Sequence, residues 1–107
     1  TGLERTLLDI TVRPNYAGGA FAVLDAYRRA VAKNDISTNK FLGNLKNTHF
    51  TYPYHQAIGF YLEKAGYSGK LLESLLQIPM PFQFYLDYEM KDKSYNKKWK
   101  IWHPTGM

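Results

Sequence analysis

The side chains best suited to binding a ligand are concentrated near the C-terminal end of the sequence. Five lysines are interleaved there with three aromatic residues, Tyr95, Trp99 and Trp102. The lysines of this basic-aromatic patch are Lys91, Lys93, Lys97, Lys98 and Lys100. Ammonium groups attract phosphates and aromatic rings stack on bases, so the patch favours contact with nucleic acid. The alternative is a charged hairpin whose lysines keep an exposed strand from pairing with other chains.

The other reactive side chains form no recognisable catalytic or metal-binding pattern. The three histidines, His49, His55 and His103, are far apart in the sequence, and no HExxH-like spacing occurs. There is no cysteine, no glycine-rich phosphate-binding loop and no serine in the context of a nucleophile. We therefore expect no enzymatic activity, no catalytic residue, no metal site and no cofactor.

A second candidate surface lies in the aromatic segment 51–61. Hydrophobic residues at helical spacing in this segment are expected to face the core, and Tyr52, His55 and Phe60 lie off that stripe. Aromatic side chains are enriched at protein interfaces, so these three are candidate contacts for a protein partner. The alternative is that neighbouring helices of the same domain cover them.

Hydrophobic residues that recur every three or four positions predict the helices that must position these groups. Their ranges are 3–12, 20–33, 37–46, 53–66 and 68–78. Thr1 and Glu4 have capping-box spacing, and Ser37 and Ser68 are the expected N-caps of the third and fifth helices. Gly43 weakens the third helix, so four to five helices are expected.

Beyond residue 81 the hydrophobic spacing changes to alternation, which is typical of half-buried strands. We expect strands over 82–89 and 98–103, joined by a polar loop over 90–97. In the favoured antiparallel register two lysines face acids and two aromatic residues face each other: Glu89 with Lys98, Asp87 with Lys100, and Tyr85 with Trp102. The predicted fold is α+β and mainly helical, with four to five packed helices followed by a C-terminal two-stranded antiparallel hairpin.

Length and composition favour a single domain, residues 1–107, with one hydrophobic core. Hydrophobic residues make up 45% and charged residues 21%, which excludes a fully disordered or fibrous chain. The longest apolar run, residues 20–24, is too short to cross a membrane, so we expect a cytoplasmic protein without a membrane partner. The net charge of +5 is dispersed, since residues 82–107 contribute only +2. In the expected register, the lysines that face no acid and could contact nucleic acid are mainly Lys91, Lys93 and Lys97, at the tip of the hairpin.

Several stretches are similar to motifs that occur together in one group of bacterial proteins. Residues 4–9 read ERTLLD, residues 13–14 read RP and residues 16–19 read YAGG. Residues 52–63 read YPYHQAIGFYLE, and residues 82–90 form an aromatic strand-like stretch. Together they resemble the C-terminal region of AbiEi-type antitoxins, predicted transcriptional regulators of viral defence systems. The resemblance covers nearly the whole chain.

The resemblance implies a two-part bacterial protein that acts in phage defence. An N-terminal winged-helix domain, expected upstream of Thr1 and absent from this sequence, would bind operator DNA and repress its own operon. The region in residues 1–107 would neutralise a nucleotidyltransferase-like toxin, directly or functionally, as the antitoxin of a type IV toxin–antitoxin system in abortive phage infection. DNA recognition by a winged helix does not carry over to these residues. The alternative is a stand-alone nucleic-acid-binding domain that uses the basic-aromatic hairpin.

Overall fold

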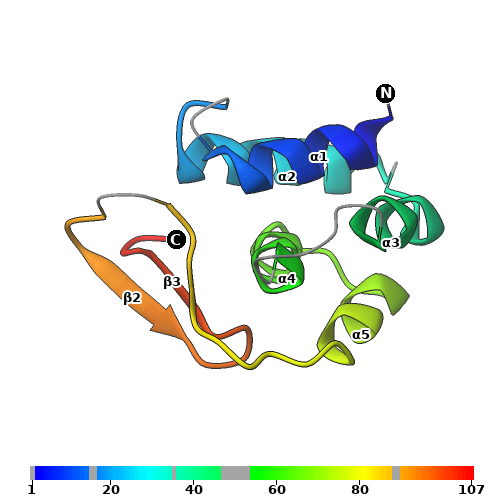
Figure 1. Cartoon of the computed structure of the whole chain (residues 1–107). Helices are drawn as coiled ribbons and strands as arrows, with labels where there is room; N and C mark the ends of the chain where they lie inside the picture. Colours follow the sequence, from blue (N-terminus) through cyan, green and yellow to red (C-terminus); the bar gives the residue numbers. More distant parts are fainter. Residues whose placement is uncertain (1, 15–16, 35, 47–53, 88–89) are drawn as a thin grey trace.

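The computed structural model describes residues 2–14, 17–34, 36–46, 54–87 and 90–107 of the chain. This part of the chain forms five helices and a three-stranded sheet, a mainly helical α+β fold as predicted (Figure 1). The helices are α1 (Leu3–Val12), α2 (Ala20–Lys33), α3 (Thr38–Lys46), α4 (Tyr54–Lys64) and α5 (Lys70–Leu76). The strands are β1 (Phe84–Tyr85), β2 (Lys93–Asn96) and β3 (Ile101–Pro104).

The helix ends follow local rules with one exception. α1 stops just before Pro14, and α2 is followed by the C-cap Asn34, whose left-handed backbone donates its N–H to the carbonyls of the last turn. The predicted N-cap of α3 is confirmed, because Ser37 Oγ accepts a hydrogen bond from the backbone N–H of Lys40 at 3.3 Å. The predicted cap of α5 at Ser68 is wrong, since the chain enters that helix one residue later, through a glycine with no side chain to cap it.

Glu4 connects two helices. The capping box predicted for it includes Thr1, which lies outside the described residues. Glu4 is only 4% exposed, and its Oε2 accepts a hydrogen bond of 2.9 Å from the backbone N–H of Ser37. The carboxylate therefore ties the first turn of α1 to the start of α3, while Arg5 and Asp9 form an exposed ion pair along α1.

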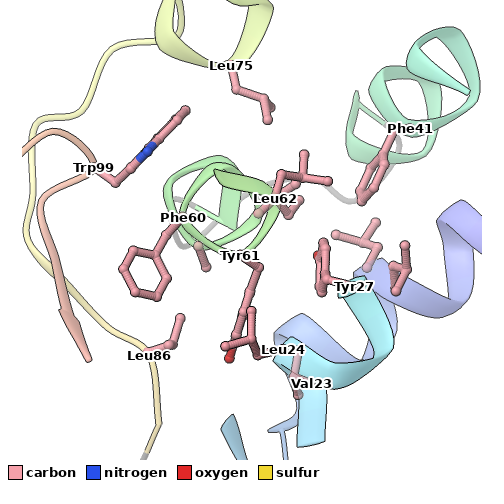
Figure 2. Packing of buried hydrophobic residues seen from close by; sticks show 14 of the residues in the cluster. Val23, Leu24, Tyr27, Phe41, Phe60, Tyr61, Leu62, Leu75, Leu86 and Trp99 are labelled. Atoms are coloured by element: carbon pink, nitrogen blue, oxygen red, sulfur yellow. The ribbon is translucent and has the colours of Figure 1, made fainter. Parts of the chain in front are cut away.

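α4 lies at the centre of the fold, between the layer of α1 and α2, the helix α5 and the strand β3 (Figure 1). Every residue from 55 to 62 is buried. The ring of Tyr61 on α4 stacks on Tyr27 of α2 with centroids 5.0 Å apart (Figure 2). The Tyr27 hydroxyl lies 2.6 Å from Thr11 Oγ1 of α1. One buried aromatic pair thus joins α1, α2 and α4.

Trp99 fixes the C-terminal segment to α4. Its indole is fully buried and lies directly against Gly59, where a Cβ atom would overlap the ring. The indole Nε1 donates to Glu63 Oε1 at 3.3 Å, and the Trp99 carbonyl accepts from Gln56 Nε2 at 2.7 Å. Gln56, Gly59 and Glu63 are spaced by about one helical turn, so they form one face of α4 that holds this tryptophan.

The sheet has the strand order β1-β3-β2, with β1 parallel and β2 antiparallel to β3. An antiparallel hairpin is present, as predicted, but its strands are β2 and β3. Tyr85 does pair with Trp102, although in a parallel arrangement. The expected loop over 90–97 contains the whole of β2.

The predicted hairpin register is wrong because of the burial of Trp99. The Trp99 backbone N–H donates to Asn96 Oδ1 at 3.0 Å, which closes a turn after β2, and Lys100 has a left-handed φ of 52°. Residues 98–100 are therefore outside any strand. Asp87, the expected partner of Lys100, instead accepts a hydrogen bond of 2.9 Å from the N–H of Ala20 at the start of α2. Glu89, the expected partner of Lys98, lies outside the described residues.

None of the helices in the described ranges is both long and apolar enough to cross a lipid bilayer.

Candidate nucleic-acid interface

The outer face of the sheet carries a row of three aromatic side chains. Along β3 alternate residues are buried, with Ile101 0% and His103 7% exposed, so Trp102 faces the other way. Tyr85 on β1 and Tyr95 on β2 are the register partners of Trp102. The Tyr85 and Trp102 rings lie 6.1 Å apart at 18°, and the Tyr95 and Trp102 rings 5.0 Å apart at 45°. We call Tyr85, Trp102 and Tyr95 the aromatic row.

The aromatic row is both held in place and accessible. Trp102 Nε1 donates to Gln83 Oε1 at 3.1 Å, which fixes the orientation of the central indole. Tyr85 is 56% exposed, while Tyr95 and Trp102 are half-buried. A hollow of about 310 Å³ between α1 and β1 adjoins the row, because its lining includes Tyr85 and also Gln83, the hydrogen-bond partner of Trp102. The row thus presents aromatic area that solvent or a ligand can reach.

Three of the five predicted lysines lie on β2 or next to it, and β2 is the strand that carries Tyr95. Lys93 and Tyr95 are two positions apart on β2 and therefore lie on the same face of the sheet. The Nζ atom of Lys93 lies 5.6 Å from the centre of the Tyr85 ring. Lys91, two residues before β2, and Lys97, directly after it, are exposed. None of the three forms an ion pair with a residue in the described ranges. Their predicted location at the tip of a hairpin is wrong, because they flank or belong to an edge strand.

The other two lysines stabilise the fold instead of extending the patch. Lys98 Nζ forms an ion pair with Glu63 of α4, the same carboxylate that accepts from the Trp99 indole. Lys100 Nζ donates to the carbonyl of Met80 at 2.9 Å. Trp99, which the sequence placed in the patch, is fully buried and cannot stack on a base. Lys91, Lys93 and Lys97 are therefore the lysines of the candidate interface.

Of the three residues predicted to contact a protein partner, the two that the structure describes, His55 and Phe60, are buried. Phe60 is fully buried against the ring of His103, with centroids 4.8 Å apart, and His55 is 5% exposed. His55 Nε2 lies 3.0 Å from the carbonyl of Pro79, and burial lowers the pKa of the imidazole despite that hydrogen bond. Neighbouring elements of the domain thus cover both side chains, the alternative that the sequence left open. Tyr52 lies outside the described residues.

Tyr85 and Gln83 are the interface residues that the sequence analysis did not assign to the patch. The predicted pairing of Tyr85 with Trp102 was the available signal, because two aromatic cross-strand partners must share one face of a sheet. Among the described residues, no three histidine, aspartate or glutamate side chains lie close enough together to hold a metal ion.

No protein-family model matches the chain, and no curated protein and no solved structure does so either. The likeness to AbiEi-type antitoxins therefore rests on the sequence motifs alone.

Proposed function

We propose that the chain is the effector region of a bacterial antitoxin and transcriptional regulator that neutralises a nucleotidyltransferase-like toxin in abortive phage infection. The motifs ERTLLD and YPYHQAIGFYLE support this proposal. Their polar residues have defined positions in the fold: Glu4 binds the start of α3, and Gln56 and Glu63 hold Trp99. Because these motif residues have structural roles in this fold, proteins that share the motifs are expected to share the fold as well. The resemblance in sequence therefore also supports a common architecture.

Within that role, the sheet face is proposed to contact nucleic acid. The observation that carries this part of the proposal is the aromatic row with Lys93 beside it, together with two more exposed lysines near the ends of β2. Lysines neutralise phosphates without reading sequence, and an exposed ring adds about 1–3 kcal/mol for each base that stacks on it. The same observation favours the second candidate function, a stand-alone nucleic-acid-binding domain.

Binding is tested by fluorescence anisotropy with a single-stranded oligonucleotide of about 20 nucleotides and its duplex. Three phosphate contacts predict that affinity falls roughly 20-fold for the single strand and roughly 40-fold for the duplex between about 50 and about 200 mM salt. Replacing Lys91, Lys93 and Lys97 together by Glu should abolish binding and its salt dependence. The matched control replaces three other exposed cations by Glu and should retain most of the affinity. These are Arg5 on α1, Arg28 on α2 and Lys70 on α5.

The stacking contribution is tested separately with Tyr85→Ala. We expect weaker binding of the single strand, by about 5-fold to 150-fold, with an unchanged salt slope, because the substitution removes a ring and no charge. Equal affinity of the lysine variant and its control would refute contact through the sheet face.

The antitoxin role is tested by co-expression with the toxin gene of the neighbouring open reading frame. We expect the protein encoded by the whole open reading frame to restore growth. Failure to restore growth would reject the antitoxin proposal. The anisotropy measurement would then decide whether the chain is a nucleic-acid-binding domain.

A further inference from the structure

α1 and α2 form a layer on the other side of α4 from the strand β3 (Figure 1). A second surface lies between these two helices. Leu3, Leu7 and Ile10 of α1 line one wall of a hollow of about 600 Å³, and Ala26 and Ala30 of α2 line the other. These residues recur at one-turn intervals on each helix, so the hollow follows the helix axes as a groove. From Leu3 to Ile10 it extends for about 10 Å.

The groove has an apolar floor and an accessible apolar edge. Leu7 is 1% and Ala30 4% exposed, whereas Leu3 is 36% exposed. The two alanines on α2 leave a depression that larger side chains would fill. A trough of this width between two helices is the shape into which a third helix inserts hydrophobic residues at positions i, i+3 or i+4, and i+7.

The rim of the groove is positively charged. Arg29 and Lys33 lie one turn apart on α2, and Lys40 extends from α3. All three are exposed, and none is ion-paired with a residue that the structure describes. Glu4 is the only acid among the lining residues, and it is buried and bound to the Ser37 N–H. The accessible charge of the groove is therefore cationic.

We propose that this groove binds an acidic amphipathic helix of a partner protein. The hydrophobic side chains of the partner helix would pack on Leu7 and Ala30. Its carboxylates would lie against Arg29, Lys33 and Lys40. A nucleic acid is a poorer occupant, because a sugar-phosphate backbone leaves the apolar floor unfilled. A second copy of this chain is also disfavoured, because a two-fold interface would bring the same cations together.

The test uses two labelled, lactam-stapled peptides of about 14 residues, long enough to span the groove. Both carry leucine along one face; the first has glutamates on the flanking positions, and the second has glutamine there. We expect the glutamate peptide to bind at least about tenfold more tightly, and the difference to shrink with added salt. Equal affinities would overturn the proposal, because charge complementarity would play no part.

Two variants of the protein locate the binding site. Ala26→Leu fills the groove at a half-buried helical position without a helix-breaking residue, and should reduce affinity by about tenfold or more. Joint replacement of Arg29, Lys33 and Lys40 by Glu should abolish the preference for the glutamate peptide. Arg28→Glu, on the exposed side of α2 beside Asp25, is the matched control and should bind as the parent does.

The thermal transition of Ala26→Leu shows whether it is folded; if it is not, the charge variant alone decides. Unchanged affinity in the charge variant would place the peptide elsewhere and refute the proposal. A dimer of the parent that dissociates in Ala26→Leu would assign the groove to a second copy. Duplex DNA that requires the three cations would assign it to nucleic acid. Either result would overturn the proposal.

Discussion

Gly59→Ala should strongly destabilise the domain, although alanine is the better helix former. Gly59 lies in the middle of α4, and the indole of Trp99 occupies the space that a side chain would need. A Cβ atom there would lie 2.6 Å from Cε3 of the indole and closer still to Cζ3 and Cη2. Such distances are below any real contact of this kind, so either the indole or the helix has to move.

The expected magnitude follows from three contributions. Removing a helical glycine favours alanine by about 1 kcal/mol. Overpacking a buried site disfavours it by about 1–3 kcal/mol. Displacement of Trp99 also weakens its hydrogen bonds to Glu63 and Gln56, each contributing about 1 kcal/mol. We therefore expect a net destabilisation of about 3 kcal/mol, or a decrease in Tm of roughly 12 °C or more.

Gly43→Ala is the matched control, because no atom lies within 4 Å of the Cβ position at Gly43 in α3. It should stabilise the domain by about 0.5–1 kcal/mol. Both variants are measured by urea unfolding, followed by circular dichroism and by tryptophan fluorescence. In a Trp99→Phe background the smaller ring should at least halve the effect of Gly59→Ala. If Gly59→Ala were as stable as Gly43→Ala, the close approach of Trp99 to α4 would be refuted.

Three further predictions concern titration and capping. Burial raises the pKa of Tyr27 and Tyr61 above the ordinary 10.0, so the unfolded chain loses protons that the folded one keeps, about one at pH 10 and nearly two by pH 11. Stability should fall as the pH rises, with a slope that approaches about 2.7 kcal/mol per unit well above pH 10 and averages about 1.4 kcal/mol per unit in urea titrations from pH 9 to 11, and Tyr27→Phe should halve it. His55 has its pKa lowered from 6.5 by burial, so protonation favours the unfolded chain; stability should decrease as the pH falls below about 6.5, and His55→Gln should remove its share of that slope. Asp87→Ala should destabilise the domain by about 1–2 kcal/mol through loss of the bond to the Ala20 N–H, and Asp87→Asn by less; equal effects would refute the capping role.

The helices were predictable because their signals are local. The hydrophobic stripe of α2 and the block that Pro14 imposes after α1 depend on neighbours within a few residues, and both helices have the predicted bounds. Ser37 was predictable for the same reason. The cap of α5 was not, because Ser68 and Gly69 are both acceptable before a helix and only the path of the preceding chain selects between them.

The sheet was less predictable because its pairing is decided at long range. Alternation shows which residues share a face, and the pairing of Tyr85 with Trp102 follows from that, but alternation does not fix strand direction. The position of Trp99 depends on Gly59, 40 residues earlier in the sequence. The sequence of β2, KSYN, is polar and therefore predicts a loop, but an edge strand with one face in solvent tolerates such a composition.

The same long-range contacts explain why the basic-aromatic patch was only partly predictable. Composition identified the lysines, but the roles of Lys98 and Trp99 were set by Glu63 on α4. A lysine whose charge is bound to a carboxylate of its own chain attracts phosphate less than one that is free of such a pair. The fold thus divides one charged stretch of sequence into a part that anchors the sheet and a part that remains accessible.

This division makes α4 the element on which both proposed surfaces depend. One face of α4 holds Trp99 through Gln56 and Glu63, and thereby fixes β3 and the central ring of the aromatic row. Another face stacks Tyr61 on Tyr27, and thereby supports the floor of the groove between α1 and α2. The exposed residues of the two surfaces are separate, so substitutions at one should leave binding at the other unchanged. A substitution within α4, by contrast, disturbs both, because the same helix is the common support.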